Sequence, residues 1–367
     1  MNCNLSISIR SFLVCTLLLA GCTDRDAPGF EEAATIPLQL MVNTVSGSAD
    51  TRSVVSQTGT AAGQVGAIGV CLALASDGHS AYATPEASST LFTVSGSDVW
   101  TASRPVNLRS VQARLYAWYP ADESNLATVD NGTTRTVAIT LPASQTFDGA
   151  NATDCSQTDY LYGSASATAG DATSITVNRD NNNPMIYLQH ALTRLIFTIE
   201  YKAGRVPDSE YDWVKSISLE GPFRAGAGTL QLNDGTLAFS SSATPVTLTF
   251  SVAQNPQLPG DIGTPARVAY GLVAPKGATA QSVTVKLVLG QKSTSANDRT
   301  LTATTNLFNA EWAKGNSYTY KLLLDKNDIT IKSVSIKGWT DVSSGSSTEV
   351  PPVSYTHLRA HETELHL

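Results

Sequence analysis

Apolar and polar residues alternate along most of this chain, from Ile36 to Ile336. A period of two residues is typical of β-strands that bury one face. Gly, Pro, Asn and Asp residues separate many of the alternating runs, as turns between strands require. We therefore predict an all-β protein built from many short strands. The alternating runs cover residues 36–42, 68–74, 111–119, 137–139, 175–177, 217–219, 230–232, 237–239, 246–252, 283–289, 318–324 and 329–336.

Three local features refine this prediction. Asn233-Asp234-Gly235 lies between two alternating runs and predicts a β-hairpin. The apolar run from Leu188 to Tyr201 is rich in β-branched and aromatic residues, which favours a strand. The alternation slips by one residue between Ile331 and Val334, which indicates a β-bulge.

The length of the chain, 367 residues, accommodates two domains after its N-terminal leader. The run from Asn181 to Pro184 is strongly loop-like and is the boundary that we predict. Many short strands separated by turn residues favour antiparallel sandwiches. The prediction is therefore an N-terminal β-sandwich over residues 35–183 and a C-terminal β-sandwich over residues 184–343.

The N-terminal residues have the pattern of an export signal. The apolar run from Phe12 to Ala20 follows Arg10 and is far too short to be a permanent membrane helix. Leu19-Ala20-Gly21-Cys22 resembles a bacterial lipobox, which implies that residues 1–21 are removed and that Cys22 carries a lipid. The alternative is an ordinary secretory signal with a chance cysteine. The polar residues 22–34 then form a flexible tether.

Composition limits the partners and the redox chemistry. The formal net charge is −7 and no basic stripe is visible, which argues against nucleic acid as a partner. Cys3 and Cys15 leave with the signal peptide, so Cys71 and Cys155 remain. An exported protein can pair them, but sequence does not give their distance. Because Cys71 lies in an apolar strand pattern and Cys155 in a polar loop, unpaired thiols are favoured.

The sequence lacks the motifs that would indicate an enzyme. It has no Gly-x-Ser-x-Gly elbow, no Cys/His pair and no phosphate-binding glycine loop. His361 and His366 are five residues apart, whereas a zinc-protease helix needs histidines four apart. His190 follows an apolar strand start, where a packed structural histidine is the more common reading. We therefore expect no catalysis, no metal and no cofactor.

Two further features have competing interpretations. Five tryptophans could stack on sugars, but each lies in or beside a strand, where packing is the more common role. These are Trp100, Trp118, Trp213, Trp312 and Trp339. Residues 344–367 are expected to be a linker followed by a tail. The tail, residues 353–367, resembles translated sequencing-adapter read-through, and we predict that it is not native.

Five short motifs, in this order and spacing, resemble the fimbrillin family of Bacteroidetes. They are Tyr116-Ala117-Trp118-Tyr119-Pro120, Asp159-Tyr160-Leu161-Tyr162-Gly163, Leu188-Gln189-His190-Ala191-Leu192-Thr193-Arg194-Leu195, Trp312-Ala313-Lys314-Gly315-Asn316-Ser317-Tyr318-Thr319-Tyr320 and Ile336-Lys337-Gly338-Trp339. The resemblance implies two tandem transthyretin-like β-sandwiches and a structural, adhesive subunit of a cell-surface fimbria. It implies an outer-membrane lipoprotein precursor whose partners are other fimbrial subunits, in a homo- or hetero-polymer, with a host protein or glycan as a further ligand.

The resemblance also implies a maturation step. In the family a trypsin-like protease cuts after an arginine and removes the first strand, and a strand from another subunit then fills the groove. Here Ile36 to Val45 would be the removable strand, and the cut would lie between Arg52 and Ser53. The alternative is that Arg52 is an exposed loop arginine without a role. The donor could be the strand from Ile329 to Trp339.

Other roles stay open at this stage. Stalk, tip and anchor subunits share the family pattern, and anchors keep their lipid. From a different functional class, a glycan-binding lipoprotein of a polysaccharide-uptake system is the alternative. Such a protein should show a cluster of exposed aromatic side chains, whereas a fimbrial subunit should show an N-terminal strand seated in a groove.

Overall fold

The computed structural model describes most of the chain downstream of the predicted tether. The described residues are 35–45, 65–82, 89–95, 99–126, 128–132, 134–147, 157–203, 211, 213–240, 245–252, 266–291, 298–325, 329–338 and 348–350. The predicted sites at Cys22, Arg52 and Ser53 lie outside these ranges, as do Cys155 and Trp339.

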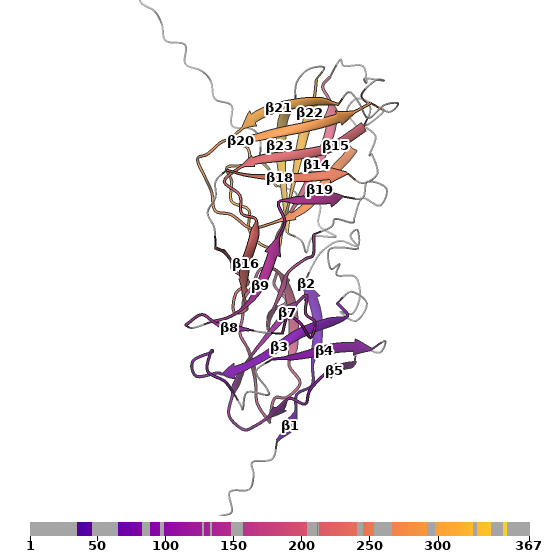
Figure 1. The fold of residues 1–367 in the computed structure, drawn as a ribbon. Coiled ribbons are helices and arrows are strands. Elements are labelled where there is room, and N and C mark those ends of the chain that lie inside the picture. Colours follow the sequence, from indigo (N-terminus) through magenta and orange to yellow (C-terminus); the bar gives the residue numbers. More distant parts are fainter. Residues whose placement is uncertain are drawn as a thin grey trace, which may run out of the picture. The chain divides into compact units, whose positions relative to one another are not determined.

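The regular secondary structure in these ranges consists of β-strands alone, which confirms the predicted all-β class (Figure 1). The described residues include no helix long and apolar enough to cross a membrane. The strands are β1 (Ile36–Pro37), β2 (Met41–Val45), β3 (Ala67–Leu74), β4 (Thr90–Ser95), β5 (Val99–Ala102), β6 (Asn107–Leu108), β7 (Ala113–Tyr119), β8 (Val129–Asp130), β9 (Arg135–Leu141), β10 (Ser144–Phe147), β11 (Leu161–Ser164), β12 (Ile175–Val177), β13 (Met185–His190), β14 (Thr193–Tyr201), β15 (Trp213–Gly221), β16 (Gly226–Gln231), β17 (Leu237–Phe239), β18 (Val246–Val252), β19 (Ala266–Val273), β20 (Val283–Gly290), β21 (Arg299–Thr305), β22 (Asn316–Leu324), β23 (Ile329–Gly338) and β24 (Thr348–Val350).

The first large sheet has the strand order β2-β13-β11-β7-β3-β4-β5, and β12 pairs with β7 beside this path. Alternate residues of these strands bury an apolar face, because successive side chains of a strand point to opposite sides. The resulting core includes Ile68, Phe92, Leu115 and Ile186, each almost fully buried. The short pair β1-β6 lies at the border of the same core, to which Leu108 of β6 contributes.

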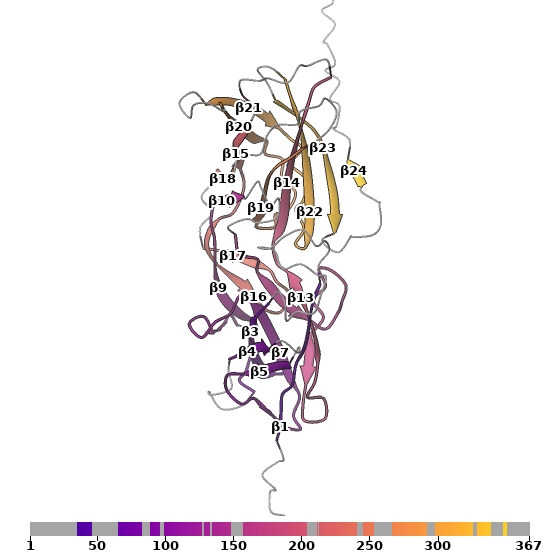
Figure 2. The same cartoon turned by 90° about the vertical axis from the view of Figure 1, so that its right-hand side faces the viewer.

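Two further sheets enclose a second core (Figure 2). Their orders are β10-β18-β15-β20-β21 and β19-β14-β22-β23-β24. Aromatic side chains contact one another within the largely aliphatic space between them. Phe308 stacks on Tyr320 with 4.1 Å between ring centroids, and Phe223 stacks on Trp312 at 5.2 Å. Such contacts add to the stabilisation that burial of these large rings provides.

Strands from the two halves of the sequence also pair with each other. β9 pairs antiparallel with β16, within the sheet β17-β16-β9-β8, and β10 pairs parallel with β18. The buried amide of Gln145 in β10 accepts a hydrogen bond from Leu272 N at 2.9 Å and donates one to Leu272 O. These pairings, and that of β13 with β11, cross the predicted boundary near residue 183, so the two-domain division stays a prediction.

The β16–β17 hairpin confirms the turn predicted at Asn233-Asp234-Gly235. Gly235 has φ of +74°, a left-handed conformation that L-residues other than glycine rarely adopt. A Cβ atom on Gly235 would lie 2.1 Å from the ring of Tyr162 in β11. The Lys314 ammonium lies 4.7 Å from the centre of the same ring and donates a hydrogen bond to Asp234 O. This turn therefore joins three distant segments of the chain.

Several local predictions can now be checked. The apolar run 188–201 forms two strands, β13 and β14, because the backbone leaves the first sheet at Ala191 and enters another at Thr193. The bulge predicted in residues 329–336 is confirmed, since the β22–β23 register shifts there. β24 lies in the segment expected to be a linker.

Three of the tryptophans, Trp100, Trp118 and Trp312, are buried, which confirms packing roles for them. Cys71 is a buried free thiol, and burial raises its pKa. His190 is buried against Asp159, with 2.6 Å between Nδ1 and Oδ2, which agrees with a structural role.

Replacing Gly235 by alanine tests how strongly the hairpin depends on its contact with Tyr162. Gly132 is a matched control, because its φ is +78° but nothing lies within 4 Å of its Cβ position. Gly132→Ala should cost only the left-handed backbone penalty, about 1–2 kcal/mol. Gly235→Ala should lower the free energy of unfolding by about 1–3 kcal/mol more, because the added methyl overpacks the site. Urea unfolding of both variants checks this, and equal losses would contradict it.

Candidate functional site: the N-terminal edge strand

The N-terminal segment of the described chain forms the edge of the first large sheet. β2 pairs in parallel with β13, in register from Met41 with Met185 to Val45 with Gln189. It is the last strand on its side of the sheet order. The segment expected from the sequence to be removable, Ile36 to Val45, thus spans β1 and β2.

This segment buries alternate side chains. Leu38, Leu40 and Val42 are 6%, 6% and 7% exposed, whereas Ile36 and Met41 are 37% and 41% exposed. The three buried residues belong to the core of the first sheet. Burial of one such side chain is worth roughly 1.5–3 kcal/mol. Burial of three side chains at a spacing of two therefore contributes substantially to the binding of this segment.

Backbone groups of two loops hold the start of the segment. Leu38 N donates to Val106 O at 2.8 Å, and Met41 N donates to Pro184 O at 3.2 Å. Asn182 binds twice, since its carbonyl accepts from Gln39 N at 2.8 Å and its Nδ2 donates to Pro37 O at 3.0 Å. These contacts come from the loops around residues 104–112 and 178–184, and we call them the strand clamp.

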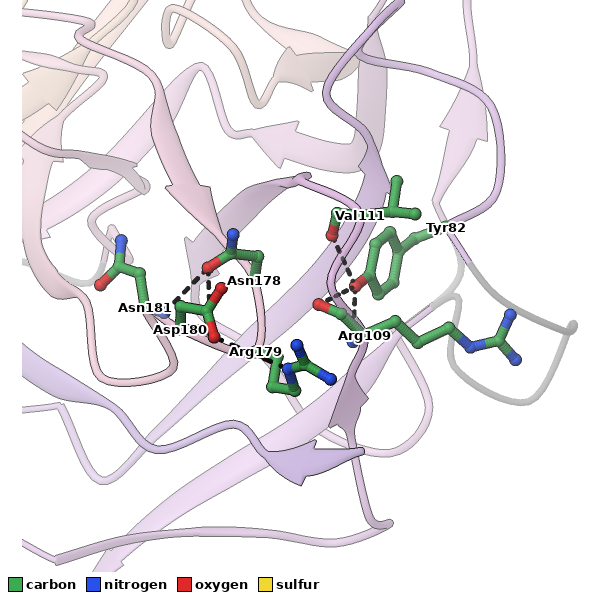
Figure 3. A network of polar contacts seen from close by, with 7 residues as sticks. All are labelled: Tyr82, Arg109, Val111, Asn178, Arg179, Asp180 and Asn181. Atoms are coloured by element: carbon green, nitrogen blue, oxygen red, sulfur yellow. Dashed lines mark hydrogen bonds and ion pairs between the residues drawn. The ribbon is translucent and has the colours of Figure 1, made fainter. Parts of the chain in front are cut away.

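A polar network fixes these two loops to each other (Figure 3). The hydroxyl of Tyr82 donates to Val111 O at 2.9 Å and accepts from Arg109 N at 2.8 Å. Arg109 O in turn accepts a hydrogen bond from Arg179 N at 2.7 Å. Tyr82 is only 6% exposed, so its ring is buried, and its hydroxyl reaches the backbone of Arg109 and Val111, two residues that are themselves exposed.

The second loop is a tight turn closed by its own side chains. Asn178 Oδ1 accepts from Asp180 N at 3.0 Å and from Asn181 N at 2.8 Å, in the manner of an Asx-turn. Asn181 Nδ2 donates to Thr176 O at 3.0 Å, and Arg179 Nε lies 3.6 Å from Asp180 Oδ1. The turn presents Asn182 to the incoming strand. The site can therefore hold an extended peptide segment by backbone hydrogen bonds and apolar burial.

The sequence identified the strand but missed the clamp. Arg52 and Ser53 lie outside the described residues, so the structure does not test them as a cleavage site. The run from Asn181 to Pro184 predicts a domain boundary, but its Asn-rich composition is also typical of a structured turn. Tyr82 carried no local signal, because its partners Arg109 and Val111 are far from it in sequence.

Other kinds of site find less support in the described part of the chain. Among the residues in the described ranges, no three His, Cys, Asp or Glu side chains are grouped so that they could hold a metal ion. No Trp, Tyr or Phe whose side chain is described is exposed, although Trp213 is half-buried beneath Lys215. The cluster of exposed aromatics expected of a glycan-binding lipoprotein is therefore missing from these residues.

Comparisons with known proteins bear on this geometry. Residues 51–339 match the fimbrillin-like family, which confirms the resemblance seen in the sequence motifs. No curated protein matches the chain significantly. β1 and β2 lie upstream of the matched segment, which begins next to Arg52.

Solved structures share the fold. A candidate cell adhesion protein from Bacteroides ovatus is 17% identical, with a TM-score of 0.53, over 83% of this chain and 98% of its own. A fimbrial protein from Bacteroides vulgatus is 14% identical, with a TM-score of 0.53, over 83% of this chain and 100% of its own. A candidate cell adhesion protein from Bacteroides uniformis is 15% identical, with a TM-score of 0.51, over 83% and 99%. At these identities the likeness concerns the fold alone.

Removing the Tyr82 hydroxyl should loosen the strand clamp. Tyr82→Phe removes the hydrogen bonds of the hydroxyl to Arg109 N and Val111 O, and one such hydrogen bond contributes about 0.5–1.5 kcal/mol. We expect that loss in the free energy of unfolding, together with faster hydrogen exchange at Leu38 N and Gln39 N. Tyr187→Phe is the control, because the half-buried Tyr187 makes no described side-chain hydrogen bond. Equal exchange rates in the two variants would show that Tyr82 does not support the clamp.

Proposed function

The chain belongs to the fimbrillin-like family, and on this premise we propose that it is a subunit of a cell-surface fimbria, assembled by strand exchange at the β2 edge. Proteins of this family are structural and adhesive, and the chain is not an enzyme. The relatives with the same fold include proteins described as fimbrial or as candidate adhesion proteins, which supports this role.

The observation that carries the proposal is the way in which the N-terminal segment packs against β13 and the core of the first sheet. A cut between Arg52 and Ser53 separates β1 and β2 from the rest of the chain. Their departure uncovers the apolar side chains beneath Leu38, Leu40 and Val42 and frees the backbone edge of β13. An extended segment of another subunit can fill such a vacancy by β-augmentation. Polymerisation then uses the same contacts that complete the unprocessed subunit.

The extent of the family match supports the position of the cut. The matched segment starts at residue 51, two residues before the N-terminus that the proposed cut would leave, so β1 and β2 lie outside it. An uncovered sheet edge with an apolar face is an aggregation hazard. We therefore place the cut after export, in a precursor held at the outer membrane by a lipid on Cys22.

The donor segment is a separate question. The sequence suggested residues 329–339, and most of these form β23, which pairs with β22 along its whole length. Ile329, Ile331 and Val334 of β23 are buried in the second core. Donation of β23 would therefore remove three apolar side chains from the subunit's own core, so a donor segment outside β23 has the lower energetic cost.

The glycan-binding alternative has less support. Sugar-binding surfaces commonly expose aromatic faces, and the described tryptophans are buried or half-buried. A stalk, tip or anchor subunit would either exchange the strand at this edge or keep its own strand there. The state of the N-terminus distinguishes them.

Mass spectrometry of the protein from its native outer membrane tests the cleavage proposal. We expect an unlipidated N-terminus at Ser53 in polymerised material. Arg52→Ala should retain a diacylated Cys22 and stay unpolymerised. Arg25→Ala, which changes the other arginine between Cys22 and Ser53, should be processed normally. Processed polymer from Arg52→Ala would refute the cleavage site, and lipidated Cys22 in all wild-type protein would indicate an anchor.

Peptide binding to the cleaved subunit tests the groove itself. A peptide of residues 36–45 should bind, and Leu40→Asp in the peptide should weaken binding at least tenfold, because a carboxylate would enter the apolar core. Met41→Asp is the matched control, since Met41 points outward, and it should change the dissociation constant less than threefold. Fluorescence anisotropy with labelled peptide gives these constants. Equal effects of the two substitutions would contradict the proposed orientation of the strand in the groove.

A further inference from the structure

A pocket of about 400 Å³ lies beside the β16–β17 turn, away from the strand clamp. Its walls come from three segments, namely residues 235–237 of the turn, residues 275–277 after β19, and residues 311–314 before β22. A pocket of this size matches a small ligand. Two lysines, Lys276 and Lys314, are part of its lining.

Lys276 is fixed on both its backbone and its side chain. Its N and O pair with Trp312 O and N, at 3.1 and 2.9 Å. Its ammonium donates to Ala310 O at 2.7 Å and lies 4.9 Å from the centre of the Trp312 ring. A cation over an aromatic face gains electrostatic attraction. The charge is therefore held in place before any ligand arrives.

Lys314 is held in the same way by another part of the fold. Its ammonium donates to Asp234 O in the β16–β17 turn and lies 4.7 Å from the centre of the Tyr162 ring. In each case the hydrogen-bond acceptors are neutral carbonyls. An ammonium has three N–H donors, so both lysines keep donors for a further acceptor.

The charge of both lysines is incompletely balanced. Within the described ranges neither ammonium forms an ion pair with a carboxylate. Glu311 acts on Lys276 from a longer distance, and Asp234 and Asp171 act on Lys314. Of these three acids only Glu311 lines the pocket. The lining therefore carries two cations and one anion.

We propose that this pocket binds an acidic sugar, with its carboxylate or sulfate held by the ammonium groups of Lys276 and Lys314. The volume suits one sugar residue with its anionic group. Stacking is not the basis of recognition, because Trp312 is buried beneath Lys276. Recognition instead depends on charge-assisted hydrogen bonds, which are stronger than neutral ones. The exposed Thr236 and the backbone of Gly277 provide polar groups for the hydroxyls of the ring.

Burial adds a dependence on pH. It lowers the pKa of Lys276 to about 8, against the opposing effect of Glu311, and it lowers the pKa of Lys314 against Asp234 and Asp171. Only the protonated ammonium attracts an anion. Binding should therefore be strongest below pH 8 and weaken as the pH rises through that value. The site is independent of the β2 edge and needs neither cleavage nor polymerisation.

Calorimetric titration of the full-length exported protein with glucuronate and with glucose 6-sulfate tests the site. Glucose is the neutral control, and acetate and inorganic sulfate are the anions without a ring. We expect at least one acidic sugar to bind with a dissociation constant of a few millimolar or lower, at least tenfold more tightly than glucose or either small anion. Lys276→Gln and Lys314→Gln should each weaken binding at least tenfold. Lys286→Gln should not, because Lys286 pairs with Glu220 on the surface.

Two further measurements keep the test decisive if a lysine variant fails to fold. Glu311→Gln removes the one acid of the lining and should tighten binding severalfold. Binding by the unaltered protein should fall severalfold between pH 7 and pH 9. Absence of binding by both acidic sugars, equal binding of glucose, or small anions that bind as tightly as the acidic sugars would each overturn the proposal.

Discussion

The need to cover the edge of β13 governs the N-terminal part of this structure. A sheet edge presents unpaired backbone groups, and here it also borders an apolar core. β2 covers both, with its backbone against β13 and with Leu38, Leu40 and Val42 against the core. The site therefore binds its strand through backbone hydrogen bonds and through apolar residues at a spacing of two.

The strand clamp decides how that segment enters. The Tyr82 hydroxyl bonds to the backbone of both Arg109 and Val111 (Figure 3). Arg179 N bonds to Arg109 O and so connects the second loop to the first, and Val106 and Asn182 of these loops both bond to the strand. Their hydrogen bonds go to the backbone of residues 37–39 and not to side chains. The clamp therefore favours one register of the bound strand. The side chains at the apolar positions determine which sequences fit.

The remainder of the fold is held together by pairings that do not involve the edge strand. β9 pairs with β16, β10 pairs with β18, and the β16–β17 turn rests on Tyr162. Removal of β1 and β2 breaks none of these pairings. The same turn also forms one wall of the pocket lined by Lys276 and Lys314, so the proposed sugar site lies outside β1 and β2.

The sequence by itself determined the all-β class, the hairpin at Asn233-Asp234-Gly235, the bulge near Lys332 and the apolar segment from Ile36. These are local patterns, because strand period and turn chemistry depend on neighbouring residues. Only the tertiary structure decided that β2 runs parallel to β13, that Tyr82 and Asn182 form a clamp, and that Lys276 and Lys314 share a pocket. Each of these depends on residues far apart in the chain, whose proximity is fixed by packing and by no local pattern.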